Sequence, residues 1–338
     1  MIATVKQGTT KEQLQGLLSW IQARGFRTDV SRGQDKTIIG IVGDTSQIDP
    51  YLLESLEIID RVQRVSEPFK LANRKFHPED SSVDCGFGVK LGHNNFQVIA
   101  GPCFIEQSHI EEIAQAAKEA GATLLQGAAF KPRTSPYAFH GIGAEGLKEL
   151  VGAAHALKMP VVSEVVDPRN VETFVDAGVD VIQIGSKNAQ NYALLSEVGK
   201  TEQAVLLKRG RDMDTDEFLL AAEYVMSAGN TKVILCERGT KTADPRLRAT
   251  FDINALPTLH ELTHLPVIVD ASHAAGFATH VERCAAAAVA AGADGLEIEI
   301  NTKAQDVPTD GAQALDFLQF AHLMHHIRAV SAALGREA

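Results

Sequence analysis

The sequence has few cysteines, no long apolar run and no excess of basic residues. Its four cysteines, Cys85, Cys103, Cys236 and Cys284, are widely spaced and form no CxxC pair. A disulfide framework is therefore not expected, and a cysteine with a special role would be a metal ligand or a nucleophile. No stretch approaches the roughly 20 uninterrupted apolar residues of a membrane span, and the first residues lack the pattern of a signal peptide. We expect a cytoplasmic protein without a membrane partner.

Acidic residues outnumber basic ones, 43 to 32, and give a net charge of −11. This balance, together with the lack of a basic face with interleaved aromatic residues, argues against nucleic acid as a partner. An acidic protein can still bind anionic substrates where basic residues are concentrated locally. The 338 residues leave room for a (β/α)₈ barrel of about 250 residues and a small additional domain.

The first 68 residues predict a small domain of the ferredoxin-like type. IATVK, FRTDVSRG, KTIIGIVG and IDRVQRVS are typical of strands, whereas TTKEQLQGLLSWIQARG and IDPYLLESLEII are typical of helices. The resulting order βαββαβ is the split-βαβ, ferredoxin-like α+β arrangement. Residues 69–95 are rich in charge, Pro, Ser and Gly, and we interpret them as a linker with a short hairpin that caps the next domain.

Residues 96–338 predict an α/β fold, a closed (β/α)₈ TIM barrel. Near-continuous apolar runs alternate with amphipathic segments, and such runs are typical of parallel strands covered by helices. Eight strands alone also fit an open sheet, but the polar residues gather where a barrel places its active site, after the C-terminal ends of the strands. The strand candidates are FQVIAG, TLLQGAAF, PVVSEV, VIQIG, AVLLKRG, KVILCERG, PVIVDAS and GLEIEI.

Two chemical groups stand at these strand ends. The first offers metal ligands from three strands and one loop: Cys103, His273, Glu299 and Asp310. Mixed sulfur, nitrogen and oxygen donors favour a divalent transition ion over Mg²⁺ or Ca²⁺. We expect Glu297 to face the helix layer instead. The second group is basic and suits two phosphate-bearing substrates; it comprises Lys131, Arg133, Lys187, Lys208, Arg209 and Arg238.

Each of these residues alone has an ordinary structural explanation. A cysteine after a strand is usually a small core residue, and lysines and arginines near strand ends commonly pair with surface carboxylates. Their co-occurrence at the predicted strand ends is what indicates a site.

Several motifs resemble one enzyme family. GPC, FKPRTSP, LLKRG, LCERG, the SH of DASHAAG, GADG with its following glutamate, and KFHPED in the linker are similar to 3-deoxy-D-arabino-heptulosonate 7-phosphate (DAHP) synthase. The resemblance is strongest to the type I branch that carries an N-terminal ferredoxin-like regulatory domain, and it extends over essentially the whole chain. It implies a condensation of phosphoenolpyruvate with erythrose 4-phosphate, the first step of aromatic amino-acid biosynthesis.

The resemblance also implies roles for single residues. Cys103, His273, Glu299 and Asp310 would hold a divalent metal ion, either Mn, Fe, Co or Zn. Lys131, Lys208 and Arg238 would contact phosphoenolpyruvate, Lys187 its phosphate, and Arg133 with Thr134 the phosphate of erythrose 4-phosphate. Glu164 and Gln183 would line the same mouth. We expect Lys131, Cys103 and His273 to form the catalytic set, with Lys131 as the candidate proton donor.

The chain departs from the family pattern at a few positions. Gln126 and Lys187 stand where the family usually has arginine, and Ala271 and Ala274 replace prolines around the SH. These changes favour, as an alternative, a related synthase that uses another phosphorylated aldose. A further alternative is a catalytically silent paralogue that binds an effector, although such a protein has no physical need for four metal-ligand positions.

The resemblance further implies that the N-terminal domain binds an aromatic amino acid, Tyr or Phe. A dimerisation or folding module is the competing interpretation of that domain. A homo-oligomer, dimer or tetramer, is expected on general grounds.

Overall fold

The computed structural model describes residues 1–33, 36–45, 48–64, 67–105, 109–131, 135, 137, 140–302 and 311–335. These residues form two compact units. The first comprises Met1–Asp80 with Glu261–His264, and the second comprises Ser81–His260 with Leu265–Ala338. Each unit has a hydrophobic cluster of its own.

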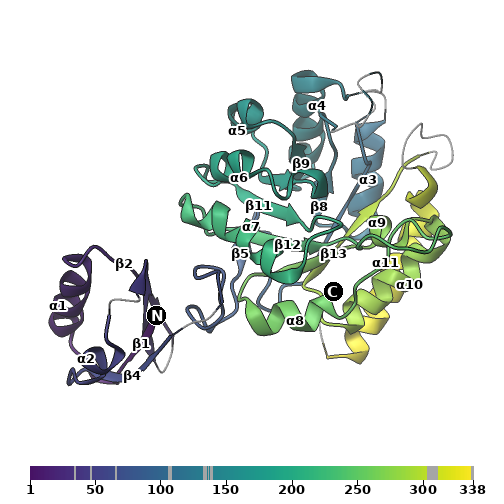
Figure 1. Ribbon diagram of the computed structural model, residues 1–338. Helices are drawn as coiled ribbons and strands as arrows, with labels where there is room; N and C mark the ends of the chain where they lie inside the picture. Colours follow the sequence, from purple (N-terminus) through teal and green to yellow (C-terminus); the bar gives the residue numbers. More distant parts are fainter. Residues whose placement is uncertain are drawn as a thin grey trace. The chain divides into compact units, whose positions relative to one another are not determined.

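The first unit contains the predicted βαββαβ order (Figure 1). Its strands pair antiparallel in the order β2-β3-β1-β4, which confirms the ferredoxin-like arrangement. Its elements are β1 (Ile2–Val5), α1 (Lys11–Gln22), β2 (Arg27–Arg32), β3 (Thr37–Val42), α2 (Pro50–Glu54) and β4 (Ile59–Gln63).

Local sequence signals explain where the two helices of this unit begin. Thr10 and Gln13 form a capping box at the start of α1, which satisfies backbone N–H groups that have no partner within the helix. One face of α1 buries Leu14, Leu17 and Ile21. Asp49 caps α2 ahead of a proline, and this helix ends at Glu54, so the predicted helix through Ile59 is too long.

The second unit is a closed, parallel eight-stranded barrel, as predicted. The last strand pairs with the first, with Glu299 opposite Gly101, and this pairing closes the barrel. In β9 and β11 every residue is buried, which explains their unbroken apolar sequences. The barrel strands are β7 (Gln97–Gly101), β8 (Leu124–Gln126), β9 (Val161–Val165), β10 (Val181–Ile184), β11 (Ala204–Lys208), β12 (Val233–Glu237), β13 (Val267–Asp270) and β14 (Gly295–Glu299).

Helices surround the strands (Figure 1). α3 is representative: Ile110, Ile113, Ala114 and Ala117 are buried, and the helix ends at Gly121 in the left-handed conformation. The helices are α3 (Ile110–Ala120), α4 (Gly143–Ala156), α5 (Val171–Ala177), α6 (Tyr192–Val198), α7 (Thr215–Ser227), α8 (Ala255–Leu262), α9 (Ala271–Ala275), α10 (Ala278–Ala290) and α11 (Phe317–Ala333).

A short hairpin, β5 (Val83–Asp84) with β6 (Lys90–Leu91), caps the barrel. Val83, Cys85 and Leu91 belong to the same hydrophobic cluster as residues of seven barrel strands, β7 to β13. Burial raises the pKa of the Cys85 thiol to about 12, so this cysteine stays protonated and packs as an apolar side chain. The hairpin expected in the linker is therefore part of the barrel core.

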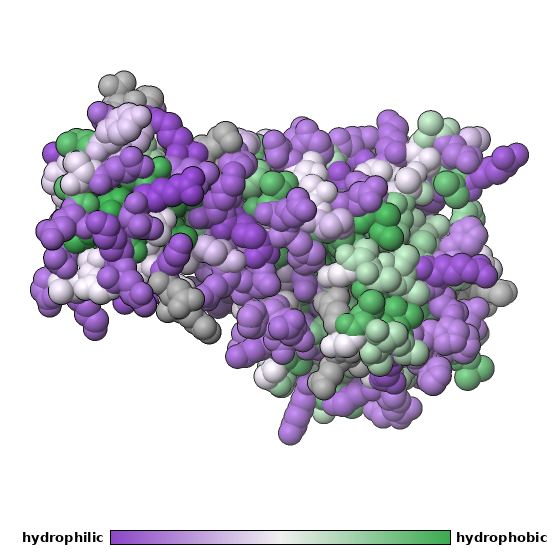
Figure 2. Space-filling model, turned by 90° about the horizontal axis from the view of Figure 1, so that it is seen from below, coloured by the Kyte–Doolittle hydropathy of each residue, from purple (hydrophilic) through white to green (hydrophobic). Residues whose placement is uncertain are grey.

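On the face shown in Figure 2, hydrophilic side chains dominate and hydrophobic ones appear in separate patches. Among the described residues, no helix is both long enough and apolar enough to cross a membrane.

The hairpin yields a stability prediction. Leu91 is fully buried, whereas Lys90 beside it is exposed. We expect Leu91→Ala to lower the free energy of unfolding by about 2–5 kcal/mol, because it leaves a cavity in the cap. Lys90→Ala should change it by less than about 0.5 kcal/mol. Denaturant titration of both variants makes the comparison, and equal effects would show that the hairpin does not belong to the core.

A second prediction concerns His264 in the first unit, which stacks on His77 with ring centroids 4.3 Å apart. Burial lowers the pKa of His264 to about 4, so the folded protein holds the neutral ring. The unfolded chain takes up its proton near pH 6.5. The contribution of His264 to the free energy of unfolding should be fully present above about pH 6.5. It should fall as the pH drops towards 4, by up to about 1.4 kcal/mol per pH unit. The free energy of unfolding of His264→Gln should depend less on pH between about pH 4 and 6.5. If its pH dependence equals that of the wild type, the low pKa of His264 is not the cause.

Candidate active site

A cavity of about 240 Å³ opens at the C-terminal ends of the barrel strands. The turn after β7 shapes one side of it: Gly101 has φ +153°, and an added Cβ would lie 2.1 Å from the backbone oxygen of Gln126. Gly185 has an ordinary φ of −70°, and a Cβ there would lie 1.9 Å from Glu164 Oε1, so the Glu164 side chain would have to move. The two glycines let neighbouring strand ends and the Glu164 side chain approach closely.

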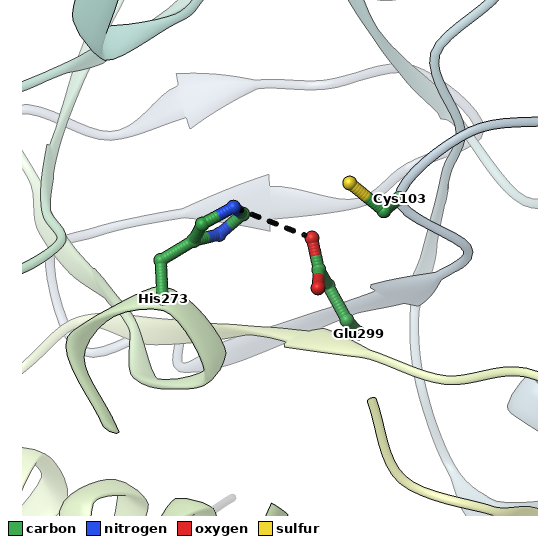
Figure 3. Close-up of side chains that lie close together, drawn as sticks. All are labelled: Cys103, His273 and Glu299. Atoms are coloured by element: carbon green, nitrogen blue, oxygen red, sulfur yellow. Dashed lines mark ion pairs between the residues drawn. The ribbon is translucent and has the colours of Figure 1, made fainter. Parts of the chain in front are cut away.

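Three side chains point to a common space in this cavity (Figure 3). Cys103 follows β7, His273 lies in α9, and Glu299 ends β14. Their ligand atoms all lie within 4.8 Å of one another, and His273 Nε2 is 3.5 Å from Glu299 Oε1. A thiol, an imidazole and a carboxylate form a donor set that fits a divalent transition ion.

Further contacts fix the orientation of two of these side chains. Asp270 Oδ2 lies 2.7 Å from His273 Nδ1, so Nε2 faces Glu299. Gln313 Nε2 donates to Glu299 Oε2 at 2.7 Å, which leaves Oε1 towards His273. Such outer contacts set the orientation and basicity of metal ligands. The donor set and its supports therefore fit a metal ion.

Lys131 lies beside this group. Its Nζ is 3.2 Å from Cys103 Sγ and 3.7 Å from Glu164 Oε2. Burial by itself lowers the pKa of Lys131, but the nearby Cys103, Glu164 and Glu299 outweigh it and raise the pKa. The ammonium group therefore stays protonated, and it can donate a proton to a group that becomes basic during a reaction.

A buried charge network forms part of the cavity lining. Lys208 Nζ is 2.6 Å from both Asp270 Oδ2 and Glu297 Oε1. Burial opposes the charge of Lys208, yet the two carboxylates raise its pKa well above the ordinary value. Burial raises the pKa of Glu297 to about 7, whereas His273 and Lys208 overcome burial and hold the pKa of Asp270 well below its usual range.

The prediction for Glu297 was wrong. This side chain lines the cavity and contacts Lys208, instead of facing the helices. Residues two apart on a strand point to the same face, so Glu297 and Glu299 both face inward. The alternation of side chains along a strand therefore already predicts, from the sequence, that Glu297 faces the same side as Glu299.

Basic side chains line the cavity as predicted for Lys131, Lys187, Lys208 and Arg238. Arg209 instead points elsewhere and pairs with Glu237 and Asp252, at 2.9 and 3.0 Å. Two lining arginines were missed, because they follow strands in loops without a periodic pattern: Arg211 and Arg248. Arg248 also donates to Gln313 Oε1 and so supports the residue that holds Glu299.

Gln126, Glu164 and Gln183 line the cavity as expected. The amide of Gln126 donates to the backbone oxygens of Gly101 and Ile298, at 3.2 and 3.3 Å. It links the ends of three neighbouring strands and carries no charge into the cavity. Arg133, Thr134 and Asp310 lie outside the described residues.

Comparison with known proteins agrees with this geometry. Residues 69–334 match the DAHP synthetase I family, and residues 1–67 match the DAHP synthase ferredoxin-like domain. The phospho-2-dehydro-3-deoxyheptonate aldolase of Thermotoga maritima is 41% identical over 336 residues, which cover 99% of each chain. A 2-dehydro-3-deoxyphosphooctonate aldolase of Syntrophotalea carbinolica is 31% identical over 269 residues, covering 74% of this chain and 95% of the relative.

Solved structures give the same result. The crystal structure of phospho-2-dehydro-3-deoxyheptonate aldolase (DAHP synthase) from T. maritima is 40% identical, with a TM-score of 0.79, and covers 99% of this chain and 98% of its own. A truncated form of the T. maritima 3-deoxy-D-arabino-heptulosonate 7-phosphate synthase has a TM-score of 0.73 and covers 79% of this chain and 98% of its own.

The three clustered side chains yield a metal-binding prediction. We expect Cys103→Ala to weaken binding of a divalent transition ion at the barrel mouth, because the soft donor is lost. Cys284→Ala, in α10 and away from the cavity lining, is the matched control and should bind as the wild type does. Equilibrium dialysis with metal analysis makes the comparison, and full affinity in Cys103→Ala would remove this residue from the ligand set.

Proposed function

The chain belongs to the DAHP synthetase I family, and from this premise we propose that it condenses phosphoenolpyruvate with D-erythrose 4-phosphate. Water is consumed, and the products are 3-deoxy-D-arabino-heptulosonate 7-phosphate and inorganic phosphate. One observation carries the proposal: a transition-metal donor set and a protonated lysine meet in a cavity lined by basic side chains. The whole-length similarity to the T. maritima aldolase supports the same reaction.

Both substrates are anionic. Basic side chains line the cavity although the chain as a whole is acidic, so the cavity suits anionic ligands. We assign phosphoenolpyruvate to Lys131, Lys208 and Arg238, with Lys187 towards its phosphate, since all four line the cavity. Glu164 and Gln126 shape the same side of it. The phosphate of erythrose 4-phosphate is assigned to Arg133 and Thr134, on the motif that contains them.

The residues of the chain perform three tasks in this reaction. The basic side chains align C3 of phosphoenolpyruvate with the aldehyde carbon, which replaces a bimolecular encounter by a fixed geometry. As C3 attacks, Lys131 supplies a proton to the aldehyde oxygen, which becomes a hydroxyl group. Water then adds to C2 and gives up one proton, which replaces the proton that Lys131 donated. The resulting phosphohemiketal cleaves the bond between C2 and the phosphate oxygen, so that the hydroxyl at C2 becomes the ketone and its proton leaves with inorganic phosphate.

We propose that Cys103, His273, Glu299 and Asp310 hold the metal ion, which is Mn, Fe, Co or Zn. When bound, the ion polarises the aldehyde carbonyl as a Lewis acid. In the proposed organisation, residues 1–68 regulate, residues 69–95 form a linker with a hairpin that caps the barrel, and residues 96–338 catalyse. An aromatic amino acid, Tyr or Phe, is the proposed effector, and the proposed assembly is a homodimer or homotetramer.

A second candidate reaction uses another phosphorylated aldose. The uncharged Gln126 amide is bound to backbone oxygens where the family usually has an arginine, and loss of one charge-assisted contact costs about 1.5–3 kcal/mol. The relative from S. carbinolica is named for an octonate product. A panel of phosphorylated aldoses decides between the candidates: preferred turnover of an aldose other than erythrose 4-phosphate would favour the second.

Turnover of metal-stripped protein tests the proposal. We expect phosphoenolpyruvate consumption with erythrose 4-phosphate to require added Mn²⁺ and to release one phosphate per turnover. Lys131→Met should lower kcat by about 10²–10⁴-fold, because the proton donor is lost, whereas Lys241→Met, on an exposed side chain, should not. Tight metal binding without turnover on any aldose would contradict an enzymatic role and favour a silent, effector-binding paralogue.

A further inference from the structure

A second group of metal-ligating side chains lies on the outside of the barrel. His322 and His326 are four residues apart on α11, so they share one face of the helix, and their ring centroids are 4.3 Å apart. Glu282 of α10 faces both: its Oε2 is 3.4 Å from His322 Nδ1, and its Oε1 contacts His326 Nδ1. One ligand atom from each residue lies within 4.8 Å of the others.

The donor set selects the kind of ion. Two imidazoles and one carboxylate suit zinc-class transition ions, whereas Mg²⁺ and Ca²⁺ require mostly oxygen ligands. The ion can be reached from solvent, because the side chains of His322, His326 and Glu282 are 60%, 46% and 39% exposed. A groove bordered by Ala278, Leu315 and Leu318 adjoins Glu282 and His322, which leaves room for a water ligand in a fourth position.

We propose that Glu282, His322 and His326 form a second site, which binds a divalent transition ion of the zinc class and ties α11 to α10. Without an ion, one carboxylate is shared between two imidazoles, and their protonated forms would repel each other at this separation. With an ion, the three donors gain a common partner, and the two helices are linked by coordination bonds. None of the three residues lines the mouth cavity, so the site is independent of the proposed reaction.

The test is a zinc titration of tag-free, metal-stripped protein against a competing chelator. The variant H322Q/H326Q should bind one equivalent fewer than the wild type, with affinity at this position reduced on the order of 100-fold, because two of three ligands are lost. H325Q is the matched control: His325 is exposed on the same helix but lies outside the cluster. It should bind as many equivalents as the wild type.

Two further readouts separate this site from the barrel mouth. The additional equivalent should raise the Tm of the wild type and of H325Q but not of H322Q/H326Q, since an ion that binds only the folded chain stabilises it. Phosphoenolpyruvate consumption should be the same in all three proteins. An equal zinc stoichiometry in wild type and H322Q/H326Q would overturn the proposal, whether or not the protein turns over its proposed substrates.

Discussion

The site depends on the contacts that the buried Asp270 carboxylate makes. This carboxylate is fully buried, and each of its oxygens has a partner: Oδ2 contacts Lys208 Nζ and His273 Nδ1, and Oδ1 accepts from the His273 backbone N–H. A buried charge is tolerated only when it is paired and hydrogen-bonded. Asp270 therefore fixes the start of α9, the orientation of the His273 ring and the position of the Lys208 side chain together.

The rest of the mouth extends outwards from this network. Glu297, with its pKa near 7, adds a carboxyl group that can share a proton with its surroundings near neutral pH. Glu299 continues the same strand face and is held by Gln313, which is in turn held by Arg248. Towards solvent the lining becomes basic, since the lining residues Lys187 and Arg211 are exposed. The cavity therefore has paired charges in its interior, the metal donors next to them, and basic side chains at its entrance.

The strand–helix alternation predicted the barrel and its order, because apolar strands and amphipathic helices have distinct periods. The position after a strand end predicted that Cys103 and His273 lie at the mouth, and the structure places both in one cavity. The sequence could not predict the contributions of Arg248 and Gln313, because they reach the site from segments that have no periodic sequence pattern. The prediction for Arg209 failed for another reason. The adjacent residues Lys208 and Arg209 point to opposite sides of the strand end, so only one of them can face the cavity.

Metal affinity of Asp270→Asn tests the account most directly. Asparagine retains an oxygen for the backbone N–H of His273, but a single neutral amide cannot replace the charged contacts to the His273 ring and to Lys208. We expect a loss of about 10–100-fold in affinity at the Cys103 site with the barrel still folded, measured by competition with a chelator and by circular dichroism. Asp252→Asn, which alters a carboxylate outside the cavity lining, should bind as the wild type does. Unchanged affinity in folded Asp270→Asn would contradict the claim that this carboxylate organises the site.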